Sequence, residues 1–336
     1  MKTKNNLRKI LAILLACAMT LAFAACGASP ANGDKPADDG TIKIAIIKQL
    51  DHASLDEIAN AVAERLTEMN EAGEAKIEFS ISSGQNDQTI LKQLCDQAIA
   101  DKVDVIIPIA TTAAQVAALS AEGTGVKVVY AAVSDPESAK LTGIDYVSGT
   151  CDALNTEFII NMMLAQNPDV KKVGLLYSLS EPNSATPIAD AKTVLEAKGI
   201  EYVEQTANTN DEVVAAASAL IAAGVDAVFT PTDNVIMAAE LAIYENLAKA
   251  GIPHYTGADS FVRNGAFATC GVNYTELGRK SAELAMKAVA GEALEDYFLM
   301  DGGIITVNTE TAAMLGADYS AFASMGEIVE VTTSKD

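Results

Sequence analysis

The chain has 336 residues, enough for two domains of ordinary size or for one large α/β unit. Half of the residues are hydrophobic and a fifth are charged, so the chain can bury a substantial core. It carries 45 acidic and 23 basic residues, and the net charge of -22 argues against a nucleic-acid-binding surface. His52 and His254 are the only histidines, too few for a histidine metal centre, and no cofactor is expected.

The first 25 residues have the pattern of a secretory signal peptide. Four cations between Lys2 and Lys9 precede an uncharged apolar run of about 16 residues, shorter than the ~20 needed to span a bilayer. The sequence Phe-Ala-Ala-Cys-Gly at 23–27 resembles a bacterial lipobox, in which the thiol of Cys26 is acylated. An ordinary secreted protein with a chance cysteine at the cleavage site is the alternative.

Residues 26–40 are rich in Gly, Pro, Ala and Asp, the composition of a flexible tether. We therefore expect a signal peptide over 1–25 and a lipidated tether over 26–40. The protein is then expected outside the cytoplasm, anchored to the cell membrane by a lipid on Cys26.

Three further cysteines, Cys95, Cys151 and Cys270, are widely spaced and form no C-x-x-C motif. Cys95 falls on the apolar face of a predicted helix and Cys270 in a predicted strand. We interpret all three as buried thiols rather than catalytic or disulfide-forming groups.

From residue 41 onward the chain alternates predicted strands and helices. The first series comprises strand 41–48, helix 55–69, strand 76–81, helix 89–100, strand 103–109, helix 113–120 and strand 126–133. The second comprises strand 172–177, helix 185–198, strand 201–205, helix 211–223, strand 226–230, helix 235–250 and strand 253–256. Two such runs predict an α/β protein with two parallel-sheet lobes and helices on both faces of each sheet.

A strand at 266–272, a helix at 275–290 and a last strand from Tyr297 follow the second series. Two simple domains would not need them. These extra elements indicate a chain that crosses between the lobes more than once.

Ligands of open parallel sheets bind outside the carboxyl ends of the strands, so the loops that follow the strands are the candidate site. These loops are 49–52, 82–84, 110–112 and 134–136 in the first series, and 180–184, 230–234 and 257–261 in the second. They are rich in hydroxyls, carboxylates and amides and poor in Lys and Arg, which favours a small polar or zwitterionic ligand. No G-x-G-x-x-G or P-loop motif supports nucleotide binding.

Each polar loop also has a purely structural explanation. Thr111, Thr112 and Ser184 precede predicted helices, where hydroxyls commonly cap the first turn. Asp135-Pro136 and Pro231-Thr232-Asp233 are ordinary turn sequences. Convergence of loops from both lobes on one crevice is what favours a binding site.

Several of these segments together resemble one family. They are residues 46–56, 109–115, 132–136, 183–184, 231–234, 257–266 and 274–279. The chain is similar to the tryptophan/tyrosine-type substrate-binding lipoproteins of ABC importers over about residues 42–335.

This resemblance implies a type I periplasmic-binding-protein fold with three crossings, near Val147, Phe261 and Gly291. The N-terminal lobe would comprise 41–147 plus 262–291, and the C-terminal lobe 148–261 plus 292–336. It also implies an extracytoplasmic binding protein, not an enzyme, that delivers a small solute, an aromatic amino acid in members of known ligand, to an ABC permease and ATPase complex.

The candidate ligand-binding residues are Gln49, Leu50, His52, Thr111, Thr112, Ser134, Asp135, Tyr177, Asn183, Ser184, Thr232, Asp233, Asn234, Asp259 and Phe261. The N-terminus of the helix at Ala113 is expected to seat an α-carboxylate, since its N–H groups and dipole favour anions. Asp233 or Asp259 is expected to pair with the α-ammonium group. Tyr177, Phe261 and Leu50 are candidates for stacking on an apolar side chain, or for the core.

Two other functions remain open at this stage. A sensor that signals to a membrane kinase or chemoreceptor would have the same sequence features as a transport receptor. An extracytoplasmic enzyme would need a nucleophile and a base, yet the chain has no G-x-S-x-G motif and only two histidines.

Overall fold

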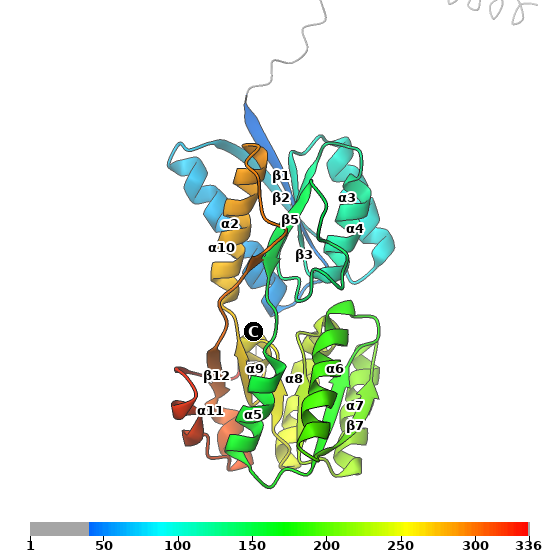
Figure 1. The fold of residues 1–336 in the computed structure, drawn as a ribbon, viewed down its shortest axis with the longest axis vertical. Coiled ribbons are helices and arrows are strands. Elements are labelled where there is room, and N and C mark those ends of the chain that lie inside the picture. Colours follow the sequence, from blue (N-terminus) through cyan, green and yellow to red (C-terminus); the bar gives the residue numbers. More distant parts are fainter. Residues whose placement is uncertain (1–39, 335–336) are drawn as a thin grey trace, which may run out of the picture. The chain divides into compact units, whose positions relative to one another are not determined.

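The computed structural model describes residues 40–334, which form two lobes (Figure 1). The predicted signal peptide, Cys26 and nearly all of the predicted tether lie outside the described residues. Between 40 and 334, no helix is both long enough and apolar enough to cross a bilayer.

The first lobe is built on a six-stranded, wholly parallel sheet with the strand order β11-β5-β4-β3-β1-β2. Its strands are β1 (Thr41–Lys48), β2 (Lys76–Ser83), β3 (Val105–Ile109), β4 (Lys127–Tyr130), β5 (Val147–Cys151) and β11 (Phe298–Leu299). Its helices are α2 (Ala53–Glu71), α3 (Gln88–Ala100), α4 (Thr111–Ala121) and α10 (Tyr274–Val289). The order reverses at β1, which lies between β2 and β3, so ligands are expected at the carboxyl ends there.

The second lobe has a seven-stranded sheet in the order β13-β12-β10-β9-β8-β6-β7, parallel except for the β10–β12 pair. Its strands are β6 (Lys172–Tyr177), β7 (Glu201–Thr206), β8 (Ala227–Thr230), β9 (His254–Thr256), β10 (Ala268–Gly271), β12 (Ile304–Asn308) and β13 (Ile328–Val331). Its α-helices are α5 (Thr156–Gln166), α6 (Ala185–Ala197), α7 (Asn210–Ala223), α8 (Asn234–Lys249), α9 (Asp259–Arg263) and α11 (Thr309–Leu315). Two short 3-10 helices, η1 (Pro182–Ser184) and η2 (Ser320–Ser324), complete the lobe.

Strand β1 illustrates why the sheets are buried on both faces. Ile44 and Ile46 pack into the core shared with α2 and α10, whereas Ala45 and Ile47 pack on the opposite side with α3 and α4. Successive side chains of a strand point to opposite faces, so an all-apolar strand needs cover on both. The α/β fold with two parallel-sheet lobes is therefore confirmed.

The predicted lobe boundaries need correction. β5, which was assigned to the second lobe beyond Val147, pairs with β4 of the first sheet, and β11 pairs with β5. β10, which was assigned to the first lobe, pairs with β9 and β12 of the second sheet. The first lobe therefore comprises 41–151 and 274–299, and the second 156–271 and 304–334. The three crossings lie at 152–155, 272–273 and 300–303 rather than near Val147, Phe261 and Gly291.

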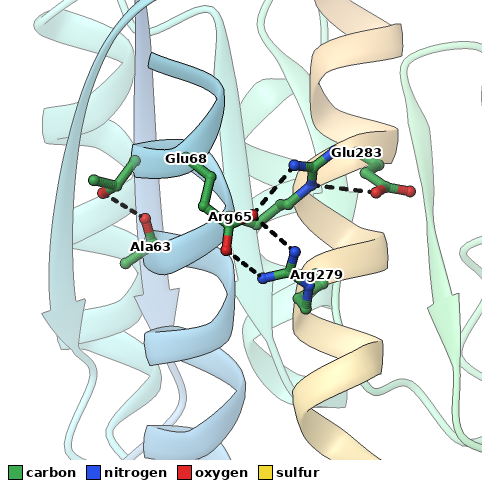
Figure 2. A network of polar contacts seen from close by, with 6 residues as sticks. Ala63, Arg65, Glu68, Arg279 and Glu283 are labelled. Atoms are coloured by element: carbon green, nitrogen blue, oxygen red, sulfur yellow. Dashed lines mark hydrogen bonds and ion pairs between the residues drawn. The ribbon is translucent and has the colours of Figure 1, made fainter. Parts of the chain in front are cut away.

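Helix α10 is fixed to the first lobe by its contact with α2, although more than 200 residues separate them in sequence. Figure 2 shows the exposed part of this contact, where Arg279 donates to both carboxylate oxygens of Glu68 over 2.9 and 2.8 Å. Arg65 of α2 bonds Glu283 of α10 over 3.2 Å. At the buried part, a Cβ on Gly278 would lie 2.6 Å from the carbonyl oxygen of Ile58, so only glycine permits this approach.

The three cysteines of the described chain are buried free thiols, as predicted. Burial raises the pKa of Cys95 and of Cys151 to about 12, and that of Cys270 to about 11. None is reactive as a thiolate at neutral pH.

Candidate functional site

A small cavity of about 20 Å³, partly open to solvent, lies between the two lobes, at the carboxyl ends of β3, β4 and β8. We call it the inter-lobe cavity. It is lined by His52, Ser54, Leu55, Ile58, Ala110, Thr111, Ala132, Ser134, Asp152, Asn183, Thr232, Asp233, Asn234, Met237, Ala258, Phe261 and Tyr274. None of these lining residues is Lys or Arg. The described residues contain no cluster of His, Cys, Asp or Glu that could hold a metal ion.

One wall of the cavity is the start of α4. Its N-cap residue, Ala110, has φ 78°, a left-handed conformation that is unfavourable for alanine, and no side chain caps the helix. The hydroxyls of Thr111 and Thr112 are buried and have no partner among the described residues. An uncapped helix N-terminus with two unpaired hydroxyls is a suitable seat for a carboxylate.

A second wall carries the carboxylate of Asp152, in the first crossing. Its Oδ1 accepts from the Ser134 hydroxyl over 2.9 Å and its Oδ2 from the Tyr274 hydroxyl over 3.1 Å. No cation pairs with it among the described residues, and burial raises its pKa. A carboxylate of this kind can accept two more hydrogen bonds, which suits an ammonium group.

Asp233 also lines the cavity, but its acceptor sites are occupied. Its Oδ1 caps α8 by accepting from the N–H groups of Val235 (3.1 Å) and Ile236 (3.0 Å). Its Oδ2 accepts from the Ser178 N–H and the Ser184 hydroxyl, both over 2.7 Å. The geometry therefore assigns Asp233 a structural task and leaves Asp152 as the better partner for a ligand ammonium.

The remaining lining is mostly apolar and comes from three helices: Leu55 and Ile58 of α2, Met237 of α8 and Phe261 of α9. Phe261 is held in place by an edge-to-face contact with His254, with ring centroids 6.4 Å apart. His254 is itself fixed between Glu240 (3.0 Å) and Thr230 (2.8 Å). The cavity thus combines the start of α4 and the Asp152 carboxylate with an apolar wall, and His52, Asn183, Thr232 and Asn234 add further polar groups to its lining.

Hydrogen bonds join the lobes around the cavity. Ser134 meets Thr232 at 3.1 Å, and the Thr186 hydroxyl donates to Asp135 over 2.7 Å. The hydroxyls of Ser54 and Ser260 are also in contact. The largest of these connections involves Gln49, His52, Glu181 and Asn234: Gln49 and Asn234 each donate to Glu181 over 2.6 Å, and Asn234 contacts His52 at 3.0 Å.

The structure brings many of the predicted site residues together at this cavity: His52, Thr111, Ser134, Asn183, Thr232, Asp233, Asn234 and Phe261. The others lie outside its lining. Gln49, Thr112 and Ser184 are buried beside it, and Leu50 packs against the core. Asp135 and Asp259 bond Thr186 and Arg263. Tyr177 is placed away from the cavity, where its hydroxyl donates to Glu204 over 2.7 Å.

Ser54, Asp152 and Tyr274 are the polar lining residues that the sequence analysis missed. Asp152 directly follows β5, a strand that was not predicted because Ser148, Gly149 and Thr150 do not form an apolar run. Tyr274 begins a helix that was predicted, but nothing in its local sequence indicates that its hydroxyl reaches Asp152. Recognition of β5 would have marked Asp152 as a residue at the carboxyl end of a strand.

Comparison with known proteins gives consistent results. Residues 43–321 match the model of a family described as ABC transporter substrate binding protein. A relative described as a tyrosine-binding protein, from Clostridioides difficile, is 28% identical over 323 residues, which cover 94% of this chain and 93% of the relative.

Two solved structures add information on the fold. The Streptococcus pneumonia ABC domain in complex with L-Trp has a TM-score of 0.79 at 24% identity, covering 87% of this chain and all of that one. The ligand-free, open structure of a Clostridium difficile substrate binding protein with adhesive properties has a TM-score of 0.65 at 27% identity, with the same coverage.

Proposed function

The chain belongs to the ABC transporter substrate binding protein family, and from that premise we propose that it captures an amino acid with an apolar or aromatic side chain. The inter-lobe cavity is the proposed binding site, and an ABC permease and ATPase complex receives the ligand. Members of this family bind substrates and do not transform them, so no catalytic step is proposed.

The observation that carries the proposal is the combination of three features in one cavity. The uncapped start of α4 with Thr111 and Thr112 suits an α-carboxylate, and Asp152 suits an α-ammonium. Leu55, Met237 and Phe261 suit an apolar side chain. The tyrosine-binding relative and the L-Trp complex support an aromatic one.

A thermal-shift screen of the mature protein in detergent tests this assignment. L-tyrosine, L-tryptophan and L-phenylalanine are expected to raise Tm in proportion to the logarithm of their concentration above Kd, because they bind only the folded state. The matched D-amino acids serve as controls, since they place ammonium and side chain differently. A rise in Tm with myo-inositol or a sugar, and with none of the amino acids, would contradict the proposal.

We also propose that the protein is an extracytoplasmic lipoprotein anchored through Cys26. The cationic and apolar start of the chain, the lipobox-like segment and the tether composition support this. The expected result for Cys26→Ala is protein that stays unprocessed or is released from the membrane, whereas the wild type partitions into the detergent phase of a Triton X-114 extraction. Wild-type protein recovered in the aqueous phase with a free thiol at Cys26 would refute lipid anchoring.

A further inference from the structure

We propose that Glu181 is a proton-binding latch between the lobes: it carries a proton when they are closed on a ligand and releases it when they separate. The proposal rests on the proposed function, capture of a ligand between the lobes, and adds a regulatory property to that site. Glu181 does not line the inter-lobe cavity, so its role is to position the lobes rather than to touch the ligand.

The latch is a buried cluster that spans the two lobes. Glu181 precedes η1 of the second lobe and is 2% exposed. Its Oε1 accepts from Gln49 of the first lobe over 2.6 Å. Its Oε2 accepts over 2.6 Å from Asn234, which in turn contacts His52 of the first lobe at 3.0 Å. Separation of the lobes breaks the Gln49 and His52 contacts and exposes Glu181 to water.

A charge on Glu181 is poorly compensated in this closed cluster. Both of its hydrogen-bond donors are neutral amides, no cation pairs with it among the described residues, and the Asp233 carboxylate lies nearby. Burial, and after it the nearby charge of Asp233, raises the pKa of Glu181 from 4.5 to about 8. Gln49 Oε1 is buried without a donor among the described residues, and Gln49 Nε2 also donates to Asn86 Oδ1 over 3.0 Å. Half-turns of the Gln49 and Asn86 amides would turn Gln49 Oε1 toward a proton on Glu181 and keep the bond to Asn86.

Other charged groups around the latch contribute to its pH dependence. They are Asp233 at the start of α8, His52 at the start of α2, Lys48 with its partners Asp51 and Asp56, and Asp135, which accepts from Thr186. Burial raises the pKa of Asp233 as well, so this carboxyl responds to the charge on Glu181. The Lys48 ammonium is bound by two carboxylates, so its charge is largely neutralised locally. The pKa of His52 shifts in the opposite direction to that of Glu181, because burial lowers it from 6.5 to about 4.

The signs follow from linkage between closure and protonation. The raised pKa of Glu181 stabilises the closed state at low pH, and this stabilisation is lost as pH rises toward 8. The lowered pKa of His52 stabilises the closed state above 6.5, and this is lost as pH falls toward 4. Between pH 6.5 and 8 the proton gained by Glu181 on closure exceeds the fraction of a proton released by His52, so ligand binding should take up a net fraction of a proton there.

Isothermal titration calorimetry of the mature protein with L-tyrosine and with L-tryptophan tests the latch. Titrations at pH 7.3 in phosphate and in Tris, which differ in ionisation enthalpy, give the number of protons taken up. We expect a net uptake of about 0.7 proton per ligand bound by the wild type, since Glu181 gains more than His52 releases, and a Kd that rises roughly tenfold from pH 6.5 to 8.

Glu181→Gln separates the latch from a merely structural role. Glutamine resembles the protonated carboxyl, so the variant should bind without proton uptake, with a Kd that is nearly constant from pH 6.5 to 8 and no weaker than wild type at pH 8. Glu74→Gln, an exposed carboxylate beyond the end of α2, should behave as wild type. Glu181→Ala should weaken binding at every pH, because the lobes lose the Gln49 bond and Asn234 loses the partner that orients it toward His52.

The outcomes distinguish the two proposals. Binding by the wild type without proton uptake, or equal uptake by Glu181→Gln, overturns the latch and leaves the proposed function intact. Weaker binding by Glu181→Gln at all pH values, with wild-type proton uptake, shows a structural role only and also overturns it. Absence of binding of both amino acids removes the proposed function, and the latch with it.

Discussion

Replacing Asp152 with asparagine is expected to raise the Kd for the captured amino acid by about 30-fold to several thousand-fold, a loss of about 2 to 5 kcal/mol. Asp152 is the cavity carboxylate that retains free acceptor sites, since Ser134 and Tyr274 are the side chains that donate to it among residues 40–334. An ammonium group buried beside it in the closed cavity would lose its counter-charge in the variant. The ligand-free fold should change little, because an uncompensated buried charge is removed.

Titration calorimetry with L-tyrosine and L-tryptophan measures the loss, and urea unfolding without ligand reports the fold. Asp259→Asn is the matched control. Asp259 does not line the cavity, and its Oδ2 is held by Arg263 at 2.9 and 3.0 Å, so its Kd should stay within about threefold of wild type. The opposite result, with Asp259→Asn weakened and Asp152→Asn unaffected, would place the ammonium at Asp259.

The regular part of the fold could be predicted from sequence because its information is local. Apolar runs such as 44–47 and helical spacings such as that of α2 identify strands and helices without knowledge of their partners. β5 escaped detection because its burial depends on a distant residue: a Cβ on Gly149 would lie 2.3 Å from Tyr130, so the small residues of β5 fit only beside β4. The sheet to which β10 belongs depends on its pairing with β12, a contact that no local pattern encodes.

For the candidate site, too, the sequence predicted the local part, which is the position of the loops, but not the roles that depend on distant contacts. The rule that ligands bind at the carboxyl ends of strands located loops that line the inter-lobe cavity, including those of Thr111, Ser134 and Asp233. It did not separate a residue that faces a ligand from one that holds the loop. The bonds that Asp233 accepts from the N–H groups of Val235 and Ile236 are local and follow from the sequence. The bonds from Ser178 and Ser184 form only when the second lobe is folded.

Asp233→Asn is accordingly expected to destabilise the second lobe, lowering the free energy of unfolding by about 2 to 4 kcal/mol. The Asp233 side chain is fully buried and accepts four hydrogen bonds. Asparagine keeps one acceptor oxygen, and its amide nitrogen would face donors in place of the other. At least one buried N–H or O–H group then loses its partner, which is the main cost.

Urea unfolding of the ligand-free mature protein, followed by circular dichroism, measures this effect, and Asp87→Asn is the matched control. Asp87 caps α3 with the same local geometry, accepting from the N–H groups of Thr89 (2.7 Å) and Ile90 (3.2 Å), but it is exposed, and its further partner is the exposed side chain of Thr89 rather than a buried group. Since asparagine caps helices nearly as well as aspartate, Asp87→Asn should cost less than about 0.5 kcal/mol. Equal, small losses in both variants would show that the Ser178 and Ser184 bonds contribute nothing, and would return Asp233 to consideration as the partner of the ligand ammonium.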